Sequence, residues 1–282
     1  MELVLAGREV ARYVAEPNVD PRRGPRPYLH PVRTLGGVVV TDVEPEDHPH
    51  HLGVSVALQD VNGANLWGGR TYVRGTGYEW RDDHGRIEHV AWQARADDRF
   101  AERLRWLAPD GTTLLGEERT VAAAPLLDAW VLDFGYVLTN VGAQPVSLGS
   151  PGTNGRPGNA GYGGFFWRAA AAQPRVFHAT SDVEAEVNGS TGPWVAMTAD
   201  GGGPADGGGP TRYTLVFTGL GDGDHWFVRA NEYPGVCVAL AFEHVRRLEP
   251  GAALRRRHRI VVADGARTAA EVKQYVAALD HS

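Results

Sequence analysis

The feature that most constrains the fold is a period-two alternation of large apolar residues with other residues. In the stretch 130–138 (WVLDFGYVL), every even position is large and apolar. Successive side chains of a β-strand point to opposite faces, so this alternation indicates a strand with one buried face. The stretch 100–107 (FAERLRWL) behaves similarly and leads through Asp110-Gly111 into 112–115 (TTLL). Asp-Gly between two apolar stretches predicts a β-hairpin.

Similar short segments predict further strands. They lie at residues 53–59, 89–94, 194–198, 212–218, 236–242 and 254–263. Helix signals are scarce, and the convincing one is a capping box at 268–271 (TAAE), followed by apolar residues at helical spacing. We therefore predict an all-β fold, a large antiparallel β-sandwich with long loops, as a single domain over residues 1–282. One C-terminal helix, at about 268–279, is expected to pack on a sheet face or edge.

Composition and charge narrow the possible partners. The chain has 282 residues, 43% hydrophobic and 22% charged, which is ordinary for a globular protein with a substantial core. Its formal net charge is −6, and no basic block stands apart. Nucleic acid is therefore not an expected partner, because phosphate binding needs a clustered positive face. No stretch has the apolar length of a membrane helix or a signal peptide, so we expect a cytoplasmic protein without a membrane partner.

Cysteine and glycine use exclude some chemistry. The single cysteine, Cys237, lies in an apolar stretch and is expected to be a small buried hydrophobe rather than a nucleophile. The glycine-rich segment 199–210 (ADGGGPADGGGP) predicts a flexible exposed loop. The segment 149–164 differs, because Asn154, Arg156, Asn159 and Tyr162 are interleaved with its glycines. Neither segment contains the Gly-Lys-Ser/Thr of a phosphate-binding loop.

The best candidate for a working site is the cluster at residues 47–51. It reads Asp47-His48-Pro49-His50-His51. Imidazole titrates near neutral pH, so paired histidines serve as general acid and base or as metal ligands. Pro49 cannot donate to a strand ladder, which predicts a strand edge or a loop. Asp47 is expected to orient a neighbouring imidazole through its Nδ1 hydrogen.

A second proline-framed segment, 26–31 (RPYLHP), carries His30. If the two segments converge in space, His30 joins the cluster. Two chemistries then stay open: acid–base catalysis, or a divalent metal cofactor held by some of the four histidines. A third alternative is that these histidines are exposed loop residues without a role. The spacing His-x-His places two imidazoles on one strand face, but it does not identify the other ligands.

Two pairs of an aromatic residue and an arginine are candidates for sugar binding. They are Trp167 with Arg168 and Trp226 with Arg229. Each pair suits a stacking platform with a hydroxyl clamp, although aromatic residues are more often part of a core. His258 alternates with apolar neighbours, so we expect a core histidine. The chain has no Gly-x-Ser-x-Gly motif, which disfavours a serine hydrolase of the α/β type.

Several long segments together resemble a known bacterial family. They are RPYLHPVRT, TDVEPEDHPHHLGVSVAL, NGRPGNAGYGGFFWR, HWFVR and LEPGAALRRRHRIVVADG, and the likeness spans residues about 26–265. The family is one of unknown function that is automatically labelled PmoA-like or "methane oxygenase". That label is misleading here, because the membrane oxygenase subunit has transmembrane helices and this sequence predicts none. More distantly, the chain is similar to galactose mutarotase-like proteins, which implies a supersandwich fold.

The resemblance also implies a ligand and a set of site residues. Genes of this family often lie near those of sugar oxidoreductases and sugar uptake systems, which implies a small sugar-like ligand and a functional link to a sugar oxidoreductase. Position by position, the resemblance singles out His30, Asp47, His48, His51, Arg156, Tyr162, Trp167, Arg168 and Arg229. It implies variation at His50, often to an aromatic residue, which weakens the His-x-His metal hypothesis.

The leading functional hypothesis is a lyase, hydrolase or isomerase that acts on a sugar or an oxidised (keto) sugar derivative. His48 or His51 would move a proton, Asp47 would orient that imidazole, and Arg168 and Arg156 would hold substrate oxygens.

Two alternatives stay open. The first is a metal-dependent hydrolase or lyase that uses the same histidines. The second is a non-catalytic sugar-binding module that stacks its ligand on Trp167 and Trp226.

Overall fold

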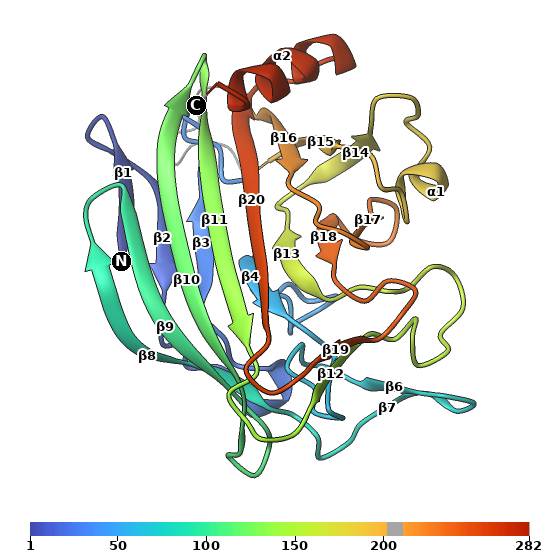
Figure 1. Ribbon diagram of the computed structural model, residues 1–282. Coiled ribbons are helices and arrows are strands. Elements are labelled where there is room, and N and C mark those ends of the chain that lie inside the picture. The colour runs from blue at the N-terminus through green and yellow to red at the C-terminus, as the bar shows by residue number, and fades with distance from the viewer. Residues whose placement is uncertain (202–210, 282) are drawn as a thin grey trace.

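The computed structural model describes residues 1–201 and 211–281, and antiparallel β-sheets dominate it (Figure 1). One large sheet has seven strands in the order β1-β2-β3-β4-β13-β18-β17. Its strands are β1 (Glu2–Leu5), β2 (Arg8–Val14), β3 (Tyr28–Val32), β4 (Val54–Ala57), β13 (Gly164–Arg168), β18 (Gly235–Ala239) and β17 (His225–Arg229). We call it the seven-stranded sheet.

The second large sheet has eight strands in the order β14-β15-β16-β20-β11-β10-β9-β8. Its strands are β14 (Ala172–Phe177), β15 (Trp194–Asp200), β16 (Arg212–Thr218), β20 (Ala253–Asp264), β11 (Ala129–Thr139), β10 (Thr113–Leu126), β9 (Arg99–Leu107) and β8 (Arg86–Arg95). Every strand predicted from the sequence lies within or overlaps a strand of these two sheets. The predicted hairpin is also present, since β9 pairs with β10 across a turn closed by Ala108 and Thr112.

Smaller elements complete the described chain. A three-stranded sheet holds β19 (Arg246–Leu248), β12 (Val146–Gly149) and β5 (Asp60–Val61), and a two-stranded ribbon holds β6 (Thr71–Val73) and β7 (Gly77–Glu79). The helices are a short 3-10 helix (Pro21–Arg23), α1 (Glu184–Val187) and α2 (Ala269–Leu279). Within residues 1–201 and 211–281, no helix has the length and apolarity to cross a membrane.

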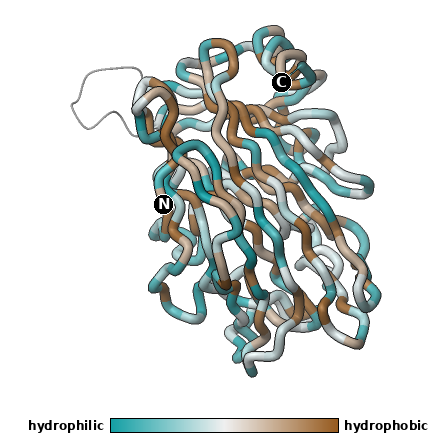
Figure 2. The backbone as a smooth tube through the Cα atoms, turned by 60° about the vertical axis from the view of Figure 1, so that its left-hand side comes forward, coloured by the Kyte–Doolittle hydropathy of each residue, from teal (hydrophilic) through white to brown (hydrophobic). Residues whose placement is uncertain are grey.

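The two large sheets pack face to face and share one apolar core. Phe134 of β11 and Phe165 of β13 meet there with ring centroids 5.1 Å apart. The even positions of the stretch 130–138 all lie in this core. Brown and teal stretches alternate along the long strands in Figure 2, as one-sided burial requires. The predicted antiparallel β-sandwich is therefore confirmed.

Helix α2 covers the outer face of the eight-stranded sheet. Its Val272, Tyr275 and Leu279 pack on strand residues that include Val216 and Val261. The capping box is present, with Thr268 and Glu271 bonded to each other's backbone. The predicted C-terminal helix is confirmed, whereas α1 was not predicted, because four residues are too few to show a helical period.

The outer face of the seven-stranded sheet carries a second aromatic layer. Along β13, Phe165 and Trp167 point into the core, whereas Phe166 points outward. Phe166 joins Phe227, Cys237 and other residues in a separate apolar cluster. Cys237 is fully buried, and burial raises the pKa of its thiol to about 12, so it behaves as the small hydrophobe that was predicted.

Most of the predicted exposed loop at 199–210 lies outside the described residues, which resume at residue 211.

His258 lies in the core, as its alternation predicts, and is 1% exposed. Its Nδ1 lies 3.0 Å from the carbonyl oxygen of Gly219, which indicates a neutral ring with its hydrogen on Nδ1. Burial lowers the pKa of His258 to about 3, from 6.5 for an ordinary histidine. Between these pH values the unfolded chain binds one more proton than the folded chain. Stability therefore falls as the pH falls below 6.5.

We expect this residue alone to remove about 2 kcal/mol of stability between pH 7 and pH 5, at about 1.4 kcal/mol per pH unit below its ordinary pKa. Urea unfolding at both pH values, for wild type and His258→Gln, measures the effect. The variant should lose less stability on acidification than wild type. Parallel losses in the two proteins would show that His258 does not titrate as described.

Candidate functional site

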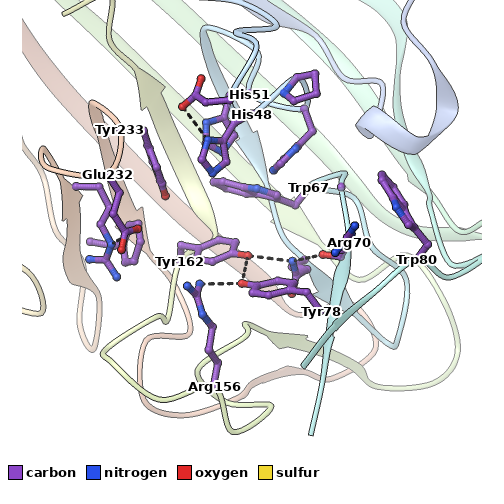
Figure 3. A pocket seen from close by; sticks show the side chains of 17 residues that line it. His48, His51, Trp67, Arg70, Tyr78, Trp80, Arg156, Tyr162, Glu232 and Tyr233 are labelled. Atoms are coloured by element: carbon purple, nitrogen blue, oxygen red, sulfur yellow. Dashed lines mark hydrogen bonds and ion pairs between the residues drawn. The ribbon is translucent and has the colours of Figure 1, made fainter. Parts of the chain in front are cut away.

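A cavity of about 350 Å³ lies beside the outward-facing aromatic layer of the seven-stranded sheet (Figure 3). We call it the His48 cavity, and its volume lies in the usual range for small-molecule sites. The residues that line it are Asp47, His48, Pro49, His50, His51, Gln59, Trp67, Gly69, Arg70, Tyr78, Trp80, Arg156, Tyr162, Phe227, Arg229, Glu232 and Tyr233.

The histidine cluster lies on a loop that leads into β4. An isolated bridge pairs Val43 with Leu52 and closes the loop at its base. Within it, the amide of His48 donates to the carbonyl of Pro45, and the amide of His51 donates to the carbonyl of His48. These turns bend residues 47–51 so that their side chains reach the cavity, as the proline-containing sequence predicted for a loop.

Asp47 connects His48 to a buried arginine. Its Oδ2 lies 2.8 Å from Nδ1 of His48. Arg168 donates from Nη2 to Oδ1 at 2.9 Å and to Oδ2 at 3.1 Å, and its side chain is 5% exposed. Partial burial acts to raise the pKa of Asp47, but the hydrogen bond from His48 and the charge of Arg168 outweigh it, so the pKa is lowered. Asp47 is thus ionised at neutral pH and accepts the Nδ1 hydrogen of His48.

The ring of His51 packs against one face of the His48 ring. The two rings are stacked, with centroids 4.6 Å apart and an angle of 13° between their planes. Phe166 and Tyr233 contact the His51 ring edge-on. His51 is 1% exposed, and burial, reinforced by nearby positive groups, lowers its pKa well below 6.5. It is therefore neutral and does not repel a proton that His48 gains.

His50 is held by two neighbours that approach it closely. Arg26 is fully buried and donates from Nη2 to the carbonyl of His50 at 3.0 Å and from Nη1 to the carbonyl of Trp67 at 2.9 Å. Gly69 has a φ of +73°, and a Cβ there would lie 2.9 Å from the His50 ring. Burial, and then the charge of Arg26, lower the pKa of His50 to about 3. His50 is therefore a neutral wall residue of the cavity.

A hydrogen-bonded chain crosses the opposite end of the cavity. Arg156 donates from Nη1 to the hydroxyl of Tyr78 at 2.7 Å, and that hydroxyl lies 2.9 Å from the hydroxyl of Tyr162. Gln59 donates from Nε2 to Tyr162 at 3.0 Å. The ribbon β6–β7 projects from the body of the molecule and brings Tyr78 to the cavity (Figures 1 and 3).

The arrangement of the histidines bears on the metal hypothesis. The lone pairs of imidazole nitrogens lie in the ring planes, so the stacked rings of His48 and His51 do not aim them at one point. In the described ranges 1–201 and 211–281, no group of three or more His, Cys, Asp or Glu side chains has the geometry of a metal site. The metal-dependent alternative therefore has no ligand set in this part of the chain.

The structure brings most of the predicted site residues together. Of those predicted, the cavity is lined by Asp47, His48, His50, His51, Arg156, Tyr162 and Arg229. Arg168 lies behind the wall, where it binds Asp47 rather than facing the cavity. The expectation that Arg168 holds substrate oxygens is corrected accordingly, because the side chain does not line the cavity.

His30 does not join the cavity. Its strand is a neighbour of β4, with Leu29 paired to Val54, so the two proline-framed segments do lie close in the sheet. The His30 side chain nevertheless bonds through Nδ1 to Thr41 at 3.0 Å and does not line the cavity. Burial lowers its pKa. The expected catalytic or metal-binding role of His30 in this cluster is therefore corrected, because its ring points to a different neighbour.

Trp167 and Trp226 are core residues and do not line the cavity. Each side chain is 0% exposed. The indole of Trp167 donates to the carbonyl of Val40 at 3.0 Å, and that of Trp226 donates to the carbonyl of Gly192 at 2.8 Å. Neither ring has a face open to a ligand. The prediction of stacking platforms at these two positions is corrected for that reason.

Several cavity residues were missed from the sequence. Trp67, Tyr78, Trp80 and Tyr233 are aromatic lining residues that were not predicted. Trp67 and Tyr233 are single aromatic residues in loops, which carry no periodic signal. The stretch 70–80 (RTYVRGTGYEW) did contain a periodic signal, since alternating aromatics flank a Gly-Thr-Gly turn in the manner of a hairpin. The structure shows this hairpin as β6 and β7.

Solved structures that match this chain do so at low similarity. The α-galactosidase AgaA of Geobacillus stearothermophilus has 10% identity and a TM-score of 0.38, over 69% of this chain and 30% of that chain. A putative aldose 1-epimerase of Escherichia coli K12 has 13% identity and a TM-score of 0.36, over 75% and 82% of the two chains. This chain thus spans about a third of the α-galactosidase.

Among functionally curated proteins, none matches the sequence. A family model does match, and it covers residues 1–277, nearly the whole chain. This match confirms the expectation of a family without an assigned function. The chain belongs to the family of unknown function DUF6807.

Proposed function

We propose that this protein is an enzyme that acts on a sugar or an oxidised sugar derivative bound in the His48 cavity. His48 is the group that moves a proton. The observation that carries the proposal is the chain from Arg168 through Asp47 to His48 at the cavity wall. An ionised carboxylate at Nδ1 keeps the hydrogen on that nitrogen, so the neutral ring offers the lone pair of Nε2 as a general base.

The remaining lining suits a ligand with apolar faces and polar edges. Tyr162 forms tilted aromatic contacts with Trp67 and with Phe227, and the three rings provide apolar surface. Gln59 and Arg156 place amide and guanidinium groups beside that surface. A sugar ring has C–H faces that pack on aromatic rings and hydroxyl edges that need such partners.

The proposed chemistry uses the lone pair of Nε2. His48 takes a proton from a carbon next to a carbonyl, or from a hydroxyl, and returns it at the neighbouring position. The neutral His51 ring stacked on His48 leaves the charged form of His48 without a like charge at contact distance. General acid–base catalysis of this kind contributes about 10²–10⁴-fold to a rate.

We expect His48→Gln to lower turnover by about 10²–10⁴-fold, because it removes the proton-transfer group while keeping a polar side chain of similar size. Product formation from a panel of monosaccharides and their keto derivatives, followed by NMR, measures this. Thermal unfolding of the variant should match wild type closely, since His48 is one-third exposed. Asp47→Asn should give a smaller loss, because it weakens the orientation of the ring and not the ring itself.

His244→Gln is the matched control, because His244 is an exposed histidine outside the cavity. The turnover of this variant should equal that of wild type. Undiminished turnover in folded His48→Gln would contradict the acid–base assignment. Saturable sugar binding with no chemical change, equal in wild type and His48→Gln, would instead favour the non-catalytic binding module.

A further inference from the structure

The hydrogen-bond chain opposite His48 leaves a hydroxyl donor for a ligand. Tyr78 accepts a hydrogen bond from Arg156, and Tyr162 accepts one from Gln59. The two hydroxyls also bond to each other at 2.9 Å, which uses one of their two hydrogens. Burial raises the pKa of both phenols, so both stay protonated at neutral pH. One O–H is therefore left to point toward a ligand.

Arg156 adds further donors to this place. Only Nη1 is engaged with Tyr78, and a guanidinium carries five N–H groups and no acceptor. Among the described residues, no carboxylate forms an ion pair with Arg156. Its guanidinium lies over the Tyr78 ring, 5.0 Å from the centroid, which holds the charge at the cavity wall.

The side chains that line the cavity also carry a net positive charge. Arg70, Arg156 and Arg229 line it, against the carboxylates of Asp47 and Glu232. Asp47 is already bonded to Arg168 and His48. Glu232 is 67% exposed and lies 3.7 Å from Arg229, so it neutralises that arginine weakly and leaves Arg156 unaffected. Once Asp47 is set against Arg168 and Glu232 against Arg229, the positive charges of Arg70 and Arg156 are left, which matches an anionic ligand.

We propose that the substrate is a sugar acid whose carboxylate binds Arg156 and the remaining hydroxyl hydrogen of the Tyr78–Tyr162 pair. This assignment of the substrate class rests on the proposed function of the same cavity. A carboxylate is an acceptor-only group with one charge, and its planar shape fits a guanidinium that can bond through two N–H groups.

Figure 3 shows Arg156 at the end of the cavity opposite to His48, with Trp67 and Tyr162 between them. The carboxylate is therefore a recognition group. The carbon or hydroxyl that His48 deprotonates lies elsewhere on the sugar. Binding energy gained at Arg156 thereby positions the reacting part of the ligand against Nε2.

Isothermal titration calorimetry tests the proposal with the uronates and aldonates of glucose, galactose and mannose, each beside its neutral amide. Wild type should bind at least one acid about 10- to 100-fold more tightly than the matching amide, because a hydrogen-bonded charge is lost in the amide. Arg156→Gln should weaken binding of that acid by a similar factor and leave binding of the amide unchanged. Arg156→Lys should fall between the two proteins, since it keeps the charge without the fork.

Arg74→Gln is the matched control. Arg74 follows β6 in the same ribbon, donates to the carbonyl of Thr153 and does not line the His48 cavity. This variant should bind acids and amides as wild type does. Thermal unfolding of all variants checks that the folds are intact.

Each contrary outcome has a distinct meaning. Equal binding of acids and amides by wild type, or an equal loss of both in Arg156→Gln, overturns the sugar-acid assignment and leaves the proposed function standing. Tighter, Arg156-dependent binding of the corresponding hexose 6-phosphates assigns the site to a phosphate and overturns the carboxylate. Absence of binding by every acid, amide and phosphate contradicts the proposed function as well.

Discussion

Trp167→Ala is expected to lower the free energy of unfolding by about 3–5 kcal/mol, because it removes a large, fully buried ring. The indole also packs edge-on against Phe217, with centroids 5.6 Å apart, and satisfies the carbonyl of Val40. That carbonyl keeps only the longer bond from the amide of Ala170, at 3.4 Å, in the variant, which adds to the cost of the cavity. Urea unfolding measures the change.

Trp80→Ala is the matched control for this prediction. Trp80 is 53% exposed and lines the His48 cavity. Its removal should change stability by no more than about 0.5 kcal/mol, as for most surface substitutions, but should weaken binding of a sugar acid. Trp167→Ala should bind the same ligand normally under conditions where it is folded. A stable Trp167→Ala protein that fails to bind the sugar acid would show that Trp167 contributes to ligand binding.

Glu117→Ala is expected to destabilise the protein by about 3–5 kcal/mol, because it leaves a buried charge without its partner. Glu117 and Arg119 both have 0% exposed side chains and form an ion pair at 2.7 Å in the core. Burial acts to lower the pKa of Arg119. The charges of Glu117 and the other acidic neighbours outweigh this effect, so the pKa is raised and the arginine stays charged. Glu117 also accepts the indole hydrogen of Trp106 at 2.7 Å.

A double-mutant cycle separates the pair from its surroundings. Arg119→Met combined with Glu117→Ala removes both charges together, and should cost at least 2 kcal/mol less than the sum of the two single changes, as an order-of-magnitude expectation. Chemical denaturation of the four proteins gives the coupling energy. Strict additivity would show that the two side chains do not interact in solution as they do in the structure.

The histidine cluster shows how far local sequence reasoning reaches. The order Asp-His-Pro-His-His predicted a loop in which a carboxylate orients an imidazole, and the contact between Asp47 and His48 is local in sequence. The contact of Asp47 with Arg168 joins residues that are 121 positions apart. No spacing in the sequence reports such a pairing, because it depends on β13 and the loop before β4 meeting at the sheet.

The tryptophans show the opposite case. Trp167 and Trp226 each lie close to an arginine in the sequence, which suggested a binding surface, whereas Trp67 gave no signal. Strand pleating decides the outcome, because neighbouring residues on β13 face opposite sides of the sheet. Phe166 therefore underlies the cavity, while Trp167 lies in the core. The packing of the eight-stranded sheet decides which face of the seven-stranded sheet is buried in the core.

The sequence by itself determined the β class of the fold, most strands of the eight-stranded sheet, the C-terminal helix with its capping box and the local Asp47–His48 pair. These follow from period-two and helical patterns and from contacts between near neighbours, which are encoded within a few residues. Only the tertiary structure decided the order of strands in the two sheets, the separation of His30 from the cavity and the meeting of Tyr78, Tyr162 and Arg156. Those contacts join distant segments, and their free energy arises only when the sheets pack and exclude water.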